Sequence, residues 1–273
     1  MSPSPKKRFG QHFLRDTGVL NHIVKWIHPS SEDFFIEIGA GDGALSLRLA
    51  PEVAHLLAIE LDIDYIPTLE STLAGFENTT VITGDILKLN LREIVQAHLK
   101  SGQNLQFAGN LPYNIATPII MRILRSNIPV ENMFFMVQLE VARRITAKSG
   151  SRQYGYLSVY CQHHSDVRIG FRVSPACFVP RPKVSSAMVS LRPKRSHFNL
   201  SFESDFDALC KAAFGHRRKT LANALAKHPI FGSIVDTLLR ISGINGGRRA
   251  EELSVGEYQH LTQTYVRFCK HLS

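Results

Sequence analysis

The stretch Phe34-Phe35-Ile36-Glu37-Ile38-Gly39-Ala40-Gly41-Asp42-Gly43 decides the predicted fold. Its first five residues, four of them apolar, predict a short buried strand. The glycines that follow let the chain turn tightly and let a ligand come close, and a helix is expected from about Ala44. The spacing Gly39-x-Gly41-x-x-Ala44 also fits the dinucleotide-binding fingerprint, so this turn alone does not identify the ligand.

Apolar runs and helical patterns alternate along the rest of the front half. Helical spacing predicts a helix from Asp16 or Thr17 to about His28. Further strands are predicted at about 55–60, 79–83, 104–109 and 132–137, with two more at 165–173 and 184–191. This alternation predicts an α/β fold with a mostly parallel sheet, on which ligands bind beyond the carboxyl ends of the strands.

Both ends of the chain differ from this pattern. Residues 1–15 form a basic arm that ends in Arg8-Phe9-Gly10-Gln11-His12-Phe13-Leu14, and we expect the end of the arm to fold against the domain. A ligand-binding domain is expected over 16–195. Only helical patterns follow residue 200, with Ser204 or Asp205 as one N-cap and Ser254-Val255-Gly256-Glu257 as a capping box. These patterns predict a small all-helical domain over 200–273.

Charge is distributed unevenly over the 273 residues. Residues 1–137 hold 11 basic and 14 acidic side chains, a net of −3, whereas residues 138–273 hold 21 and 9, a net of +12. A basic back half joined to a near-neutral front half indicates a small-molecule site attached to a surface that binds a polyanion such as RNA.

Other features exclude several classes of protein. The four cysteines lie far apart without a Cys-x-x-Cys pair, which is typical of reduced thiols in a cytoplasmic protein. No apolar run reaches the roughly 18 residues that span a bilayer, and no secretory signal follows Lys6 and Lys7. Cys161, His163 and His164 lack a second ligand cluster, so no metal site is expected. We also expect a monomer.

Two carboxylates stand at predicted strand ends. Glu60 follows the glycine turn by about 20 residues, where a carboxylate can accept hydrogen bonds from the ribose hydroxyls of an adenosine cofactor. Asp85 ends the next strand and could accept from an adenine amino group, a contact that an NAD site does not require. The alternatives are a solvated loop acid for Glu60 and a helix N-cap for Asp85.

The segment Asn110-Leu111-Pro112-Tyr113 ends a fourth strand and suggests the reaction. An exocyclic amino nitrogen is hard to methylate because its lone pair is delocalised into the ring. The side-chain oxygen of Asn110 and the carbonyl of Leu111 can accept the two amino hydrogens. Pro112 fixes the turn, and Tyr113 offers a ring on which a flipped base can stack. The alternative is an ordinary proline-containing turn.

The loop Phe178-Val179-Pro180-Arg181-Pro182-Lys183-Val184 lies between the last two predicted strands. Phe178 could cover the free face of the base, and Arg181 and Lys183 could contact phosphates. The alternative for Phe178 is a loop aromatic that packs into the core.

Together these residues resemble the small-subunit (16S) ribosomal RNA adenine N6,N6-dimethyltransferases, which use S-adenosylmethionine. The resemblance runs from about Lys6 to about Phe268 and includes Tyr154-Gly155-Tyr156-Leu157-Ser158-Val159. It implies a Rossmann-like class I methyltransferase fold with a C-terminal helical domain. It also implies dimethylation of two adjacent adenosines in a hairpin loop near the 3′ end of the RNA, late in assembly, on a pre-30S particle.

The resemblance also assigns individual residues. Cofactor contacts fall on His12, Leu14, Gly39, Gly41, Glu60, Asp85 and Asn110, although many members carry Asn where His12 stands. From their positive charge we also expect RNA contacts at Arg217, Arg218 and Lys219 and at Arg248 and Arg249, which lie in two of the matched motifs.

Three alternatives remain at this point. The erythromycin-resistance methyltransferases act on large-subunit RNA and share the glycine turn and an Asn110-type motif, but the pattern from Arg248 to Tyr258 resembles the small-subunit enzymes. An assembly factor whose binding matters more than its catalysis would also explain the basic back half. An NAD-dependent oxidoreductase rests only on the glycine spacing.

Overall fold

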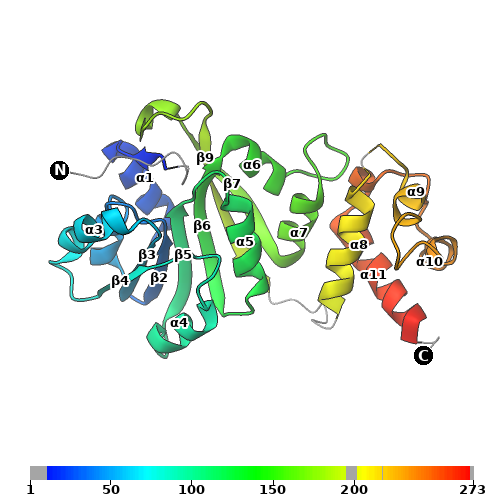
Figure 1. Ribbon diagram of the computed structural model, residues 1–273, viewed down its shortest axis with the longest axis horizontal. Coiled ribbons are helices and arrows are strands. Elements are labelled where there is room, and N and C mark those ends of the chain that lie inside the picture. Colours follow the sequence, from blue (N-terminus) through cyan, green and yellow to red (C-terminus); the bar gives the residue numbers. More distant parts are fainter. Residues whose placement is uncertain (1–10, 195–201, 217, 271–273) are drawn as a thin grey trace. The chain divides into compact units, whose positions relative to one another are not determined.

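The computed structural model describes residues 11–194, 202–216 and 218–270. By their contacts these residues divide into two compact units. The first comprises the chain up to Ala142 together with Val167–Pro193, and the second comprises Arg143–Asp166 and the chain from Lys194 onward. Figure 1 shows the strands gathered in the first unit and only helices among the labelled elements of the C-terminal region.

Seven strands of the described residues form one sheet, in the order β4-β3-β2-β5-β6-β9-β7. Their bounds are β2 Asp33–Ile38, β3 His55–Glu60, β4 Thr79–Thr83, β5 Asn104–Asn110, β6 Val130–Gln138, β7 Ser165–Val173 and β9 Ser186–Pro193. The five strands from β4 to β6 pair in parallel and β9 pairs antiparallel to β6. The predicted strands and the mostly parallel sheet are confirmed.

The parallel pairing brings the predicted strand ends to one edge. Ile38 of β2 is in register with Ile59 of β3, and Glu37 is in register with Ala108 of β5. The glycine turn and the residues after β3, β4 and β5 therefore leave the sheet at the same edge, because parallel strands share one carboxyl edge.

Helices cover both faces of the sheet (Figure 1). One apolar cluster joins α1 (Thr17–Ile27), α2 (Ser46–Leu49) and α3 (Ile66–Leu73) to Phe35 and Ala108. Side chains alternate along a strand, so Phe34 points to the opposite face, where its ring lies 6.4 Å from that of His98 in α4 (Leu91–His98). Ile38, which shares the face of Phe34 on β2, lines the same cavity as Ile119 of α5 (Ala116–Arg125), so the start of α5 lies on this second face.

Local sequence signals set some helix ends better than others. Asp16 caps α1, since its side chain accepts from the backbone N–H of Val19 at 2.9 Å, as predicted. The helix after the glycine turn begins at Ser46 and not at about Ala44, because a turn carries the chain away from the sheet first.

The described end of the N-terminal arm forms part of the first unit. Phe13–Leu14 make a short strand, β1, that pairs antiparallel with β8 (Phe178–Val179). The backbone N–H of Arg15 also donates to the carbonyl of Cys177 at 2.8 Å. The expected docking of the end of the arm is thus seen, whereas residues 1–10 lie outside the described part of the chain.

The second unit is helical. It contains the end of α6 (Leu139–Ile145) and α7 (Tyr156–His164), followed by α8 (Glu203–Phe214), α9 (Leu221–Leu225), α10 (Val235–Ser242) and α11 (Val255–Lys270). Its core includes Tyr154 and Val159 from the α7 region, packed with Phe206 of α8 and Tyr258 of α11. The contacts divide the chain after Pro193, close to the boundary expected near residue 195, but residues 143–166, which were expected in the first domain, pack with the helices that follow.

Two predicted caps in this unit have different outcomes. Ser254 and Glu257 form the predicted capping box, with Glu257 accepting from the backbone of Ser254 at 2.8 Å and Ser254 accepting in return at 3.2 Å. The prediction of Ser204 or Asp205 as an N-cap is wrong, because α8 already begins at Glu203 and Phe202 occupies the cap position. No helix in the described ranges is long and apolar enough to cross a membrane.

Candidate active site

A cavity of about 230 Å³ lies at the carboxyl edge of the sheet. All four predicted strand ends line it. The lining residues are Gln11–Phe13 of the arm, Ile38 and Gly39 after β2, Ile59–Leu61 after β3, Gly84–Leu87 after β4, and Asn110–Ile115 with Ile119 after β5. The chain thus brings an adenosine-type site and the Asn110 motif to one place, as the sequence predicted.

The glycine turn has the backbone geometry that requires glycine. Gly39 and Gly41 have φ values of +71° and +59°, in the left-handed region that side chains disfavour. A Cβ on Gly41 would lie 2.6 Å from the ring of Phe13. Phe13 of the arm therefore rests directly on the turn, and sequence analysis did not assign it a role. The signal available was only its place in the aromatic arm.

Glu60 is held by the backbone of the same turn. Its Oε2 accepts from the N–H of Gly41 at 2.7 Å, and its Oε1 accepts from the N–H of Asp62 at 2.8 Å. Burial raises the pKa of Glu60, although these backbone hydrogen bonds oppose the shift. Each carboxylate oxygen keeps a second lone pair, so Glu60 can still accept from ribose hydroxyls at the cavity wall.

Asp85 lines the same cavity and also stabilises its own loop. Its Oδ1 accepts from the backbone N–H of Leu87 at 2.9 Å, while its Oδ2 lies 3.9 Å from the ammonium of Lys88. The helix N-cap considered as an alternative is not seen, because Asp85 stabilises a turn and α4 begins only at Leu91, with Asn90 as its cap. The turn contact leaves acceptor positions on the carboxylate for an adenine amino group.

Glu37 is a buried carboxyl behind the turn. It lines a smaller cavity of about 40 Å³ that also contacts Gly39 and Asn110. Burial raises the pKa of Glu37 to about 8, against a lowering hydrogen bond donated by Ser46. Glu37 is therefore largely protonated near neutral pH in this structure.

The orientation of Asn110 is the most informative feature of the cavity. Its amide Nδ2 donates to the backbone carbonyl of His12 at 2.6 Å. Its Oδ1 is buried and has no hydrogen-bond partner in the structure. Leaving a buried acceptor unsatisfied costs roughly 1–3 kcal/mol, so an incoming donor at this position would be strongly favoured. An amino group is a donor of the kind that this unpartnered oxygen can accept.

The residues after Asn110 are fixed from two sides. The hydroxyl of Tyr113 lies 2.6 Å from that of Ser186, a fully buried residue of β9, and the ring of His12 lies 5.2 Å from the Tyr113 ring. The backbone N–H of Leu111 donates to Met136 at 3.1 Å, and Pro112 accepts from Ile115 at 3.1 Å. Sequence analysis did not identify Ser186, because nothing in its local sequence indicates the contact.

His12 and Leu14 occupy different positions relative to the main cavity. His12 lines it, and its Nδ1 lies 2.7 Å from the Pro180 carbonyl. A carbonyl only accepts, so Nδ1 carries the proton and the tautomer is set. Leu14 is buried and lines the smaller cavity. The predicted cofactor contact of Leu14 stays a prediction.

Phe178 lies away from both cavities. Its side chain is 2% exposed and belongs to the apolar cluster that includes Leu14, its partner across the β1–β8 pair. The expectation that Phe178 covers a base therefore does not fit this structure, because packing against the arm buries the ring. The core alternative describes it.

The two side chains of the first unit that are expected to contact phosphates are exposed. Arg181 and Lys183 are exposed on the loop between β8 and β9, whereas Pro182 between them is buried. This alternation directs two cations outward from an anchored loop.

The basic motifs of the second unit meet at one place. Thr220 forms an antiparallel bridge with Arg249, and Leu221 donates to the carbonyl of Arg248 at 2.7 Å. Arg218, Lys219 and Arg249 are exposed there, and Arg217 lies outside the described residues. The neighbouring cationic side chain of Lys227 lowers the pKa of Lys219, which indicates a local concentration of positive charge.

Arg248 has a structural role that the sequence did not reveal. Its guanidinium forms an ion pair with Glu257 of the capping box and donates to the Glu252 carbonyl at 2.6 Å. The hydrogen bond from Arg248 is the main reason why the pKa of Glu257 falls to about 2. The expectation of a simple RNA contact therefore needs correction, because this side chain holds the start of α11.

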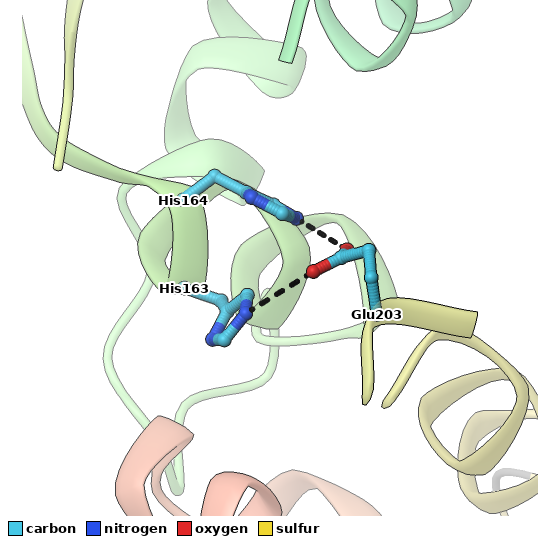
Figure 2. A group of neighbouring side chains, drawn as sticks. All are labelled: His163, His164 and Glu203. Atoms are coloured by element: carbon cyan, nitrogen blue, oxygen red, sulfur yellow. Dashed lines mark ion pairs between the residues drawn. The ribbon is translucent and has the colours of Figure 1, made fainter. Parts of the chain in front are cut away.

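One cluster in the second unit contains metal-ligating residue types. Figure 2 shows His163 and His164 of α7 pointing toward Glu203 of α8. The Nε2 atoms of His163 and His164 lie 3.6 and 2.8 Å from the carboxylate oxygens of Glu203. Burial opposes ionisation of Glu203, but the two histidine rings beside its carboxylate outweigh this effect and lower its pKa to about 2. These ion pairs account for the arrangement by themselves. The expectation of no metal site stays a prediction.

Comparison with known proteins identifies the family. The family model described as ribosomal RNA adenine dimethylase matches residues 3–266. The chain belongs to this family. It is therefore an RNA adenine dimethylase that depends on S-adenosylmethionine, as the sequence predicted. The orphaned Oδ1 of Asn110 and the ribose acceptors of Glu60 in the 230 Å³ cavity fit that cofactor and its target.

Individual relatives cover nearly the whole length of this dimethylase. It is 41% identical over 259 residues to the ribosomal RNA small subunit methyltransferase A of Methylococcus capsulatus, with 95% of this chain and 97% of the relative covered. The protein of the same name from Bacillus mycoides is 39% identical, with 96% and 91% covered.

Solved structures support the fold of the dimethylase. A dimethyladenosine transferase from Plasmodium falciparum superimposes with a TM-score of 0.79 at 24% identity, covering 95% of this chain and 98% of the other. The 23S rRNA methyltransferase ErmE superimposes with a TM-score of 0.68 at 22% identity, covering 92% and 98%. At these identities the likeness shows the class I methyltransferase fold and does not distinguish the RNA substrates.

Proposed function

We propose that this enzyme dimethylates N6 of two adjacent adenosines in a hairpin loop near the 3′ end of small-subunit ribosomal RNA. The relatives that are about 40% identical are named small-subunit methyltransferases, which supports this substrate over large-subunit RNA. The observation that carries the chemistry is the buried, unpartnered Oδ1 of Asn110 at the cavity wall.

The cavity residues have separate tasks in this reaction. When bound, S-adenosylmethionine supplies an activated methyl group. Glu60 and Asp85 bind the adenosine part through their free acceptor positions. Asn110 Oδ1 and the Leu111 carbonyl accept the two hydrogens of the target amino group, which directs its lone pair out of conjugation. Positioning of this kind can supply much of a rate enhancement without a general base.

The target base needs a rigid platform. Tyr113 is tethered through its hydroxyl to Ser186 and flanked by the His12 ring, so its ring is held in place before the base arrives. Stacking on an aromatic side chain contributes roughly 1–3 kcal/mol per base. In the second methyl transfer the first methyl group has replaced one amino hydrogen, so only one of the two acceptors keeps its hydrogen bond to the nitrogen.

The wider setting of the reaction is also proposed. A cytoplasmic monomer would act on the pre-30S particle late in assembly. The charged loop around Arg181 and Lys183 and the exposed cations Arg218, Lys219 and Arg249 would contact the RNA backbone. A role as an assembly factor is compatible with this catalysis, and the net charge of +12 on residues 138–273 supports tight binding to the particle.

Acceptor specificity tests the proposal. Labelled methyl groups from S-adenosylmethionine should transfer to unmethylated small subunits, and large subunits should accept none. Naked small-subunit RNA serves as the third arm and reports how far the particle itself is recognised. Transfer to large subunits in preference to small ones would overturn the proposed substrate.

A further inference from the structure

We propose that a groove between α4 and α5 binds the phosphates of the RNA strand that flanks the methylated base. This inference rests on the proposed function, since it concerns the same RNA. It extends that function to a surface in the first unit, where the overall charge gives no indication of RNA binding.

The groove is lined by three arginines. They come from two helices, with Arg92 on α4 and Arg122 and Arg125 on α5. The remaining lining residues carry no charge and are Leu87, Asn90, Leu91, Pro118, Met121 and Ser126. An arginine-rich wall without a carboxylate among the lining residues attracts anions, and guanidinium groups match phosphate oxygens.

Arg122 is held in a way that favours an anion. Its Nη2 donates to the backbone carbonyl of Leu89 at 2.6 Å, which fixes the guanidinium between the two helices. Its Nε is buried and has no hydrogen-bond partner. Because the Leu89 carbonyl orients the guanidinium in advance, its other N–H groups can donate to phosphate oxygens with less loss of side-chain freedom.

The groove adjoins the cavity that receives the target base. Leu87 lines both. Ile115, the residue before α5, and Ile119 on the helix line the cavity, whereas Pro118 and Arg122 line the groove. The rise of an α-helix places Arg122 about 10 Å along the axis from Ile115. A strand whose base enters the cavity would therefore pass the groove within a few nucleotides.

The local charge differs from that of its surroundings. Residues 1–137 carry a net charge of −3, yet the stretch from Leu111 to Val130 contains two arginines and no acidic residue. The volume of about 690 Å³ is three times that of the base cavity and exceeds the needs of one small anion. Both observations favour an extended polyanion over a single phosphate or an acidic cofactor.

The test uses the full-length enzyme and unmethylated small subunits. The double variant Arg92→Ala/Arg125→Ala removes two groove charges and leaves the Arg122–Leu89 hydrogen bond intact. We expect KM for the subunits to rise about tenfold or more. The slope of log affinity against log salt should fall by roughly 0.7–0.9 for each lost phosphate contact. Calorimetry with S-adenosylmethionine should give the wild-type affinity, which shows that the fold is intact.

A matched control removes the same charge elsewhere. Lys25 on α1 and Arg168 on β7 are exposed and line neither the cavity nor the groove. The variant Lys25→Ala/Arg168→Ala should keep the wild-type KM and salt slope. Equal effects of both double variants, or no effect of the groove variant, would overturn the inference. If the wild type itself methylated no small subunits, the proposed function would fail instead.

A single substitution separates charge from geometry. Arg122→Lys keeps the positive charge but loses the planar fork of donors. We expect both Arg122→Lys and Arg122→Gln to raise KM for the subunits. The two variants should have similar melting temperatures. A KM equal to the wild-type value for both Arg122 variants would contradict the anchoring role.

Discussion

The side-chain amide of Asn110 donates a 2.6 Å hydrogen bond to the backbone carbonyl of His12, across 98 positions of sequence. This contact holds the amide nitrogen against the arm and leaves the buried Oδ1 without a partner. It joins the N-terminal arm to a residue that lines the cavity.

Replacement of Asn110 should therefore affect turnover far more than cofactor binding. In Asn110→Ala the acceptor is missing, and in Asn110→Asp a carboxylate oxygen would face the His12 carbonyl and be repelled. We expect kcat to fall roughly 100-fold or more, the scale seen when a group that stabilises a transition state is removed. Single-turnover kinetics with calorimetry would measure both quantities. A loss confined to cofactor affinity, with saturated turnover intact, would contradict this role.

Phe13 and Gly41 should be energetically coupled. A Cβ at position 41 would lie 2.6 Å from the Phe13 ring, so Gly41→Ala must displace the arm and strain the turn. We expect Gly41→Ala and Phe13→Ala each to weaken S-adenosylmethionine binding. The double variant should lose less binding free energy than the sum of the two single losses, by about 0.5 kcal/mol or more, because the collision with the ring is then absent. Strict additivity in a calorimetric double-mutant cycle would show that the arm does not rest on the turn.

Glu37 should make stability fall as pH rises. Its folded pKa is about 8 and its ordinary value is 4.5, so the folded state keeps a proton that the unfolded state releases between those values. Glu37→Gln should thus add up to about 3 kcal/mol at pH 7, since each pKa unit corresponds to about 1.36 kcal/mol. The gain should vanish near pH 4.5. Denaturant unfolding across this range measures it, with exposed Glu52→Gln as the control.

Substitutions of Arg248 and Arg249 should have different effects on stability and RNA binding, although the two residues are neighbours in the sequence. Arg248→Ala breaks the ion pair with Glu257 and should lower the free energy of unfolding by about 1 kcal/mol. The side chain of Arg249 is exposed, so Arg249→Ala should leave the melting temperature unchanged and reduce the salt slope of RNA binding by about 1. Equal losses of stability in both variants would refute the distinction.

Much of this fold could be predicted because strong local patterns produce it. The strands at β2 to β6 are apolar runs bounded by turns, and Asp16 caps α1 through its own side chain. The four strand ends are expected at one edge because parallel strands share their carboxyl edge. These signals lie within short stretches of sequence, so they can be recognised without knowing the tertiary contacts.

The residues that sequence analysis missed depend on long-range contacts. Ser186 fixes Tyr113 from 73 positions away, and Phe13 rests on a turn 28 residues later. Phe178 was expected at the target base, but its pairing with Leu14 buries it. Arg248 resembled a free cation until the capping box placed Glu257 beside it. Each outcome depends on which segment packs alongside, and no local pattern encodes that.

The product of the reaction tests the central claim most directly. Unmethylated small subunits would be incubated with the enzyme and S-adenosylmethionine, then digested with nuclease and analysed by mass spectrometry. The proposed function predicts N6,N6-dimethyladenosine at two adjacent positions near the 3′ end, and its absence with Asn110→Ala. Methylation of another base or atom, or unchanged product from Asn110→Ala, would contradict the account.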